Sequence, residues 1–135
     1  MKTERFMSKS NVAKYSEFTG KVLNRLDRDV RMWYKEHGVD IPSYAFSTWL
    51  VPLSIRFIKR GRFTSCLIRG LALGQVREDV YTTSGIGFAH RMQHDKDDPE
   101  VGRKIALKRA IHDALAMELV GIKYRGNEHG IMGSV

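Results

Sequence analysis

The spacing of apolar residues changes from three or four to two and back along this chain, and that change constrains the fold most. Between residues 10 and 37, apolar side chains recur at three- and four-residue steps, which places them on one face of a helix. They are Tyr15, Phe18, Val22, Leu26, Val30 and Trp33. The opposite face carries Lys21, Arg25, Arg28, Arg31 and Lys35. Gly38 is expected to end this amphipathic helix in a left-handed conformation.

A period of two follows the helix and predicts a β-hairpin. In the first run, Leu53, Ile55 and Phe57 alternate with their neighbours, as in a half-buried strand. The second β-rich run covers residues 63–73, and the four residues between the runs include Gly61. Two such runs around a short glycine-containing turn are typical of a hairpin.

A third strand and a second helix complete the expected domain. The run from Val80 to Ala89 contains Gly85 and Gly87, which indicate a bulge or the close approach of another backbone. Residues 98–100, Asp-Pro-Glu, provide an acidic N-cap, a proline at the first helical position and an acid facing the positive end of the helix dipole. Residues 39–52 between the first helix and the hairpin are expected to be an ordered connector packed on the core.

The second helix is expected to run to about Val120 and to stop at Gly121. Its buried side would be formed by Val101, Ile105, Ala106, Ala110, Ala114, Leu115 and Leu119. The predicted fold is α+β, a single domain over residues 10–121 with a long N-terminal helix, a three-stranded antiparallel sheet and a C-terminal helix packed on the sheet. The remaining ends, 1–9 and 122–135, are expected to be flexible.

Positive charge is the unusual feature of the composition. The chain has 23 Lys and Arg against 15 acidic residues, a formal net charge of +8. A surface of this kind attracts nucleic acid, anionic lipid or an acidic protein. The cations gather at the start of the second helix and in the hairpin turn, and the candidate phosphate contacts are Arg103, Lys104, Lys108, Arg109, Lys59, Arg60 and Arg62. We therefore expect these residues to contact the backbone of a nucleic acid duplex. The alternative is that they form the solvent-exposed faces of an ordinary amphipathic helix and sheet.

Cysteine content and hydropathy argue against a disulfide-bonded, secreted or membrane-spanning protein. Cys66 is the only cysteine, so no disulfide can form within the chain, and its apolar surroundings predict a small buried hydrophobe. The first residues lack the apolar run of a signal peptide, and no stretch reaches the ~20 apolar residues of a membrane helix. The expected location is the cytoplasm, with no membrane partner.

The order helix, three strands, helix, together with the basic last helix, resembles the double-stranded RNA-binding domain. The residues at the basic, basic, alanine, alanine, alanine and leucine positions of that family are Arg103, Lys104, Ala106, Ala110, Ala114 and Leu115. Pro42-Ser43-Tyr44 also resembles the family's Pro-x-Tyr entry to the first strand. The chain departs from the family where Leu107 replaces the third lysine, and it lacks the Gly-Pro-x-His turn. The resemblance implies a module that binds duplex RNA.

A second resemblance concerns residues 85–110, where a strand, a polar loop and a basic helix start are similar to many small proteins of tailed bacteriophages. It implies an alternative function as an interaction or inhibitor protein that docks on an acidic host or defence protein, in the host cytoplasm. The candidate anchors for such docking are Tyr81, Phe88, Trp49 and Met92. The competing interpretation of these four side chains is ordinary core packing.

An enzyme is the least favoured class, although catalytic residues can be brought together by the fold alone. His90 and His94 have the i, i+4 spacing of two ligands on one helix face, which makes them weak metal candidates. They fall in a segment expected to be a loop, which does not fix ligand geometry. We therefore expect no cofactor, no resident metal and no catalytic residue.

Overall fold

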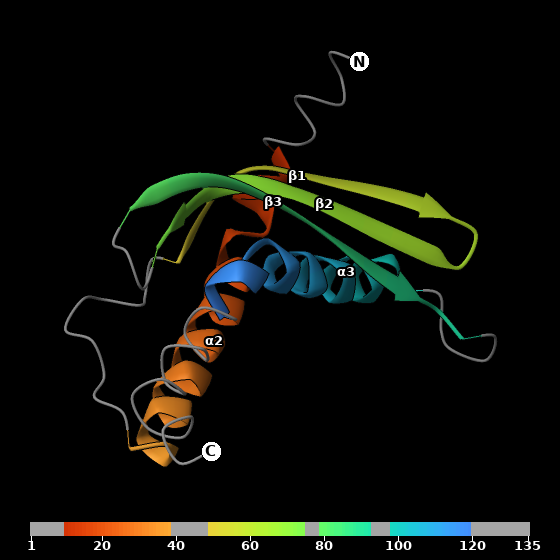
Figure 1. Cartoon of the computed structure of the whole chain (residues 1–135). Coiled ribbons are helices and arrows are strands. Elements are labelled where there is room, and N and C mark those ends of the chain that lie inside the picture. Colours follow the sequence, from red (N-terminus) through yellow and green to blue (C-terminus); the bar gives the residue numbers. More distant parts are fainter. Residues whose placement is uncertain (1–9, 39–48, 75–78, 93–97, 120–135) are drawn as a thin grey trace.

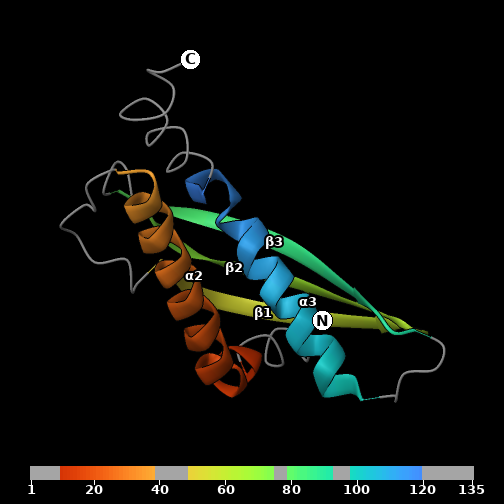
Figure 2. The same cartoon turned by 90° about the horizontal axis from the view of Figure 1, so that it is seen from below.

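The computed structural model of the chain describes residues 10–38, 49–74, 79–92 and 98–119. The elements are α2 (Ser16–Glu36), β1 (Leu50–Arg60), β2 (Phe63–Leu73), β3 (Val80–His90) and α3 (Pro99–Ala114). The strands form an antiparallel sheet in the order β1-β2-β3, and both helices lie on the same side of it (Figures 1 and 2). The α+β class and the predicted order of elements are confirmed.

The first helix has the predicted apolar face, with a rotation at its end. Residues 10–14 are helical, Tyr15 interrupts the helix, and α2 continues from Ser16. Buried side chains follow the predicted spacing through Val22, Leu26 and Val30, but Tyr34 is buried in place of its half-buried neighbour Trp33. Gly38 has φ of 65°, the left-handed conformation that ends the helix.

The hairpin is longer than its alternating pattern suggests. β1 and β2 are joined by the two residues Gly61 and Arg62, and Gly61 has φ of 59°, which glycine adopts without strain. Pro52 lies within edge strand β1, where a missing N–H donor is tolerated. The register with β2 shifts between Pro52 and Ser54, so Leu53 is 52% exposed and does not share the buried side of Ile55.

The sheet and α3 meet through backbone atoms. A Cβ atom added to Gly85 would overlap the carbonyl oxygen of Ala110, and one added to Gly87 would overlap that of Ala106. Of the two interpretations of these glycines, the close approach of another backbone is the correct one. The buried alanines of α3 supply the small side chains that such an approach requires.

The buried side of α3 differs from the predicted one. Val101 and Ile105 are exposed, and Leu107 and Ile111 are fully buried in the core beside the alanines. The reason is the rotation that brings the small alanines onto β3, which turns Val101 and Ile105 towards solvent. The N-cap is confirmed, because the Asp98 carboxylate accepts a hydrogen bond from the Glu100 N–H at 3.0 Å. α3 ends at Ala114, and helical residues follow again at 116–119.

The core lies between the helices and one face of the sheet. Trp49, Ile55, Ile68 and Cys66 are fully buried there, and burial raises the pKa of the Cys66 thiol to about 12. In the described ranges, no helix is long and apolar enough to cross a membrane. Most of the expected connector and both expected flexible ends lie outside the described residues.

Candidate nucleic-acid interface

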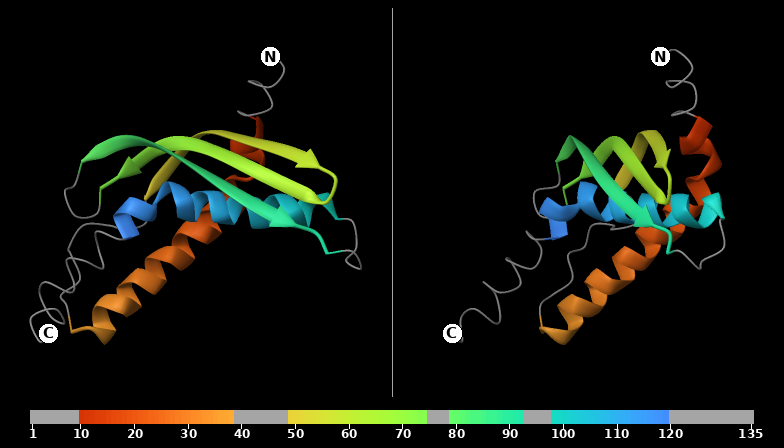
Figure 3. Two further views of the ribbon diagram at one scale, coloured as in Figure 1. Left: turned by 45° about the vertical axis from the view of Figure 1, so that its right-hand side comes forward. Right: turned by 90° about the vertical axis from the view of Figure 1, so that its right-hand side faces the viewer.

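The hairpin turn and the start of α3 border one hollow of about 390 Å³. The hairpin projects past the start of α3, so the turn overhangs the helix end (Figures 1 and 3). The strand side of the hollow is basic and includes Lys59, Arg62, His90 and Arg91. The helix side is formed by Asp98, Pro99, Val101, Gly102 and Ile105. The two predicted regions therefore come together, although α3 contributes apolar side chains and its capping acid to the hollow.

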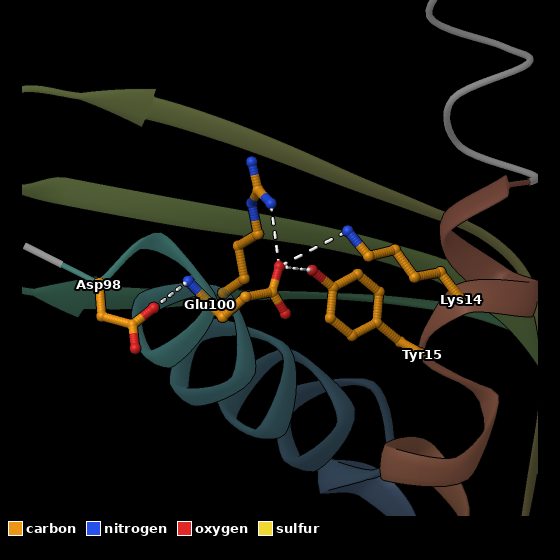
Figure 4. A network of polar contacts seen from close by, with 5 residues as sticks. Lys14, Tyr15, Asp98 and Glu100 are labelled. Atoms are coloured by element: carbon orange, nitrogen blue, oxygen red, sulfur yellow. Dashed lines mark hydrogen bonds and ion pairs between the residues drawn. The ribbon is translucent and has the colours of Figure 1, made fainter.

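Glu100 is the centre of a polar network at the start of α3 (Figure 4), and the Arg103 guanidinium belongs to this network. The Glu100 carboxylate accepts hydrogen bonds from the Tyr15 hydroxyl at 2.8 Å and from Arg103 at 3.1 Å, and the Lys14 ammonium lies 3.6 Å away. The Tyr15 hydrogen bond, aided by Arg103 and Lys14, lowers the pKa of Glu100. Arg103 thus has a carboxylate partner within α3, and it is Glu100 that joins α3 to the residues before α2.

Arg109 is bound to the edge of the sheet. Its guanidinium donates a hydrogen bond to the Phe88 carbonyl oxygen at 2.6 Å, and the Asp113 carboxylate accepts one from the Ile86 N–H at 2.9 Å. These two side chains of α3 satisfy main-chain groups on the edge of β3 that faces away from β2, where no other described strand lies. Arg109 therefore has a structural partner that helical periodicity could not reveal.

Lys104 and Lys108 face α2 and join a second group of cations. The Lys104 ammonium lies 5.8 Å from the centre of the Phe18 ring. Lys108 borders a hollow of about 420 Å³ together with Phe18, Lys21, Arg25, Asp29 and His112. Burial, and then the nearby Lys108 charge, lower the pKa of His112. Lys21, Arg25, Lys104 and Lys108 are the cations that lie along the boundary between α2 and α3, and we call this group the helix groove.

The predicted cations thus divide into separate groups. Lys59, Arg60 and Arg62 form the turn group at the hairpin tip, and the helix groove lies between α2 and α3. Within the described part of the chain, no carboxylate forms an ion pair with Arg60, Arg62, Lys104 or Lys108. Lys21 and Arg25 were predicted only to lie on the face of the first helix opposite its apolar residues, because their meeting with Lys108 depends on how the two helices cross.

The alternative docking anchors separate into buried and exposed side chains. Trp49 is fully buried, so it belongs to the core. Tyr81 is half-buried, its hydroxyl donates to Glu118 at 3.1 Å, and burial with the nearby Glu118 charge raises its pKa to about 12. Phe88 and Met92 are both more than half exposed. Two of the four predicted anchors are therefore accessible.

The two metal candidates, His90 and His94, do not form a metal site among the described residues. His90 is on β3 and stacks on Phe63, and His94 lies outside the described residues. Among the described side chains, no three His, Cys, Asp or Glu residues are grouped so that they could hold a metal ion.

Comparison with known proteins places the chain in a family. A family model described as Rv2632c-like matches residues 48–125, which contain the whole sheet, the turn group and α3. Neither curated proteins nor solved structures match the chain.

Proposed function

The chain belongs to the Rv2632c-like family, and we propose that it is a small nucleic-acid-binding protein that contacts phosphates mainly through the turn group. The observation that carries this proposal is the arrangement of three cations within four residues at a tight turn, of which Lys59 and Arg62 line the hollow. Arg60 and Arg62 have no carboxylate partner among the described residues. Their guanidinium groups are suited to grip phosphate oxygens in a bidentate manner.

The helix groove supports the same function from further along α3. One hollow borders α3 at Val101 and the other at Lys108, which places them roughly 10 Å apart along the helix axis. A phosphate backbone laid along α3 would meet the turn group first and Lys108 next. Contacts of this type fix position and carry no base code, so binding is expected to be largely independent of sequence.

The test is a titration of labelled duplex RNA, duplex DNA and single strands by fluorescence anisotropy at several salt concentrations. If about six phosphates are neutralised, a plot of the logarithm of the binding constant against the logarithm of the salt concentration should have a slope of roughly −5. In Arg60→Ala/Arg62→Ala the slope should become shallower by about 2, because two phosphate contacts are lost.

A matched control removes two cations elsewhere. Arg28 and Lys35 are exposed on α2, outside the residues that line either hollow. Arg28→Ala/Lys35→Ala lowers the net charge equally and should leave the slope nearly unchanged. Salt-independent binding, or equal losses in the two double variants, would contradict the proposal.

A second candidate function is docking on an acidic surface of a larger host or defence protein. It is favoured by the exposed side chains Phe88 and Met92, which lie close in sequence to the cations of the hollow. A pull-down from nuclease-treated lysate discriminates between the two functions. A stoichiometric protein that survives nuclease, and that Phe88→Ser releases, would support docking.

A further inference from the structure

The side of the sheet opposite the helices is partly aromatic, and no described element covers it. In the views of Figures 1 and 3 no helix lies over this side, which we call the open face. Phe63 on β2 is 56% exposed and Phe88 on β3 is 55% exposed. Cross-strand pairing places Phe63 opposite His90 and Phe88 opposite Ser65, so the two phenylalanines are diagonal neighbours.

These rings gather at the end of the sheet that carries the turn group. Phe63 and His90 are stacked, with ring centroids 4.3 Å apart and an angle of 17° between the planes. Arg60 lies opposite Phe63 on its other side, so one row across the sheet reads Arg60, Phe63, His90. A planar group that stacks on the outer side of Phe63 would lie next to the Arg60 side chain.

The charge of the open face is one-sided. The three strands contain no Asp or Glu, and the open face carries Arg56, Arg60 and Arg69 between its apolar side chains. A second copy of the chain is therefore a poor occupant, because two such faces would bring arginines together without a compensating carboxylate. The occupant should be planar, apolar on its faces and anionic along its length.

We propose that the open face binds single-stranded nucleic acid, with bases stacked on Phe63 and Phe88 and phosphates held by Arg56 and Arg60. Exposed rings on a sheet, flanked by cations, form the usual platform for unpaired bases, and arginine planes stack on bases as well. Bases within a duplex are already stacked on each other and cannot reach such rings. This inference rests on the proposed function and names the form of nucleic acid that it prefers.

The test compares ring-bearing with ringless substitutions in the full chain. The probe is a labelled oligothymidine of about ten nucleotides, with a matched duplex as the second probe, and circular dichroism verifies folding. Phe63→Leu and Phe88→Leu should each weaken oligothymidine binding by roughly tenfold, because a leucine fills the place of the ring but cannot stack. Phe63→Tyr and Phe88→Tyr should retain binding.

Two controls make the test specific. Leu53 is exposed to a similar extent near the far end of the sheet, so Leu53→Ala should bind the oligothymidine as the unsubstituted chain does. Duplex binding should be unchanged in both leucine variants. If the leucine variants bound oligothymidine normally while Arg60→Ala/Arg62→Ala reduced the salt slope, stacking would be refuted and phosphate binding would stand.

Other occupants give different results. If light scattering showed a dimer that Phe88→Arg converts to a monomer, a second copy would occupy the face, and the inference would be wrong. A protein partner that binds this face and tolerates Phe88→Leu, in a chain that does not bind oligothymidine, would overturn it as well, because apolar docking does not require a ring.

Discussion

Glu100 joins the start of α3 to the residues before α2. Its carboxylate receives a hydroxyl, a guanidinium and an ammonium, and two of these groups come from the residues before α2. Sequence reasoning placed this acid correctly in the first turn of the helix but assigned it only to the dipole. Its partners Lys14 and Tyr15 lie more than eighty positions away in sequence, and no local pattern pairs such distant residues.

We predict that Glu100→Gln lowers stability near neutral pH and that the loss disappears in acid. The folded-state pKa of Glu100 is below its ordinary value of 4.5, so its contribution is present above that value and is lost as the pH falls through the folded-state pKa. Urea unfolding at neutral pH and at about pH 3 measures the difference. The effect should be modest, because solvent screens this partly exposed group.

The control for this prediction is another acid that forms an exposed ion pair. Glu17 lies 3.5 Å from Lys21 on the surface of α2, so Glu17→Gln should change the urea midpoint little at either pH. An equal effect of both substitutions would show that the loss reflects general charge and not the network at Glu100.

At the scale of elements, the contact of α3 with β3 determines how the domain packs. Gly85 and Gly87 leave room for the main chain of α3, and the alanines at positions 106, 110 and 114 face them. The alanine spacing that resembles a double-stranded RNA-binding domain therefore has a packing reason in this chain. Whether the resemblance extends to RNA binding stays a prediction.

We predict that Gly87→Ala destabilises the protein by about 2 kcal/mol or more, because its Cβ would overlap backbone atoms that cannot change rotamer. Gly20 provides the opposite case, since a Cβ there meets nothing within 4 Å. Gly20→Ala should stabilise α2 by up to about 1 kcal/mol. Chemical denaturation of both variants checks the pair, and a stable Gly87→Ala variant would show that α3 can move away from β3.

Sequence patterns predicted each element, but not how each is rotated. The change of period predicted the type and order of the elements, and capping rules predicted the start of α3. The exposure of Leu53 depends on a bulge, which alternation alone does not reveal. In α3, apolar residues occupy more than one face, so choosing between Ile105 and Ile111 required knowledge of where the glycines of β3 lie.

At the scale of the whole molecule, the sheet has helices on one side and two long edges. Asn11 donates a hydrogen bond to the Ile55 carbonyl oxygen of β1 at 3.0 Å, and Arg109 and Asp113 cover β3. Unpaired strand edges recruit other chains, so these contacts oppose association. The candidate site also depends on the arrangement of whole elements. The position of the hairpin turn over α3 and the crossing of α2 and α3 determine which cations lie close together.

We predict that Arg109→Ala/Asp113→Ala associates more readily than the unsubstituted chain, because it uncovers the Ile86 N–H and the Phe88 carbonyl of β3. Dynamic light scattering over a concentration series measures the association. Lys108→Ala is the control, since it removes an exposed cation of the same helix, whereas Arg109 and Asp113 are the residues that bind the strand edge. Monodisperse double variants at every concentration would argue that the edge is protected by other means.

The glycines of β3 also have a consequence for ligand size. A side chain can rotate to absorb a neighbour's substitution, whereas two main chains in contact can neither slide nor roll without separating. At the start of α3 the constraint is weaker, because a Cβ added to Gly102 would lie 3.1 Å from the Thr64 hydroxyl oxygen, which is a side-chain atom. The distance between β3 and α3, which bounds the hollow beneath the hairpin, is thus limited by two positions that carry no charge and no side chain.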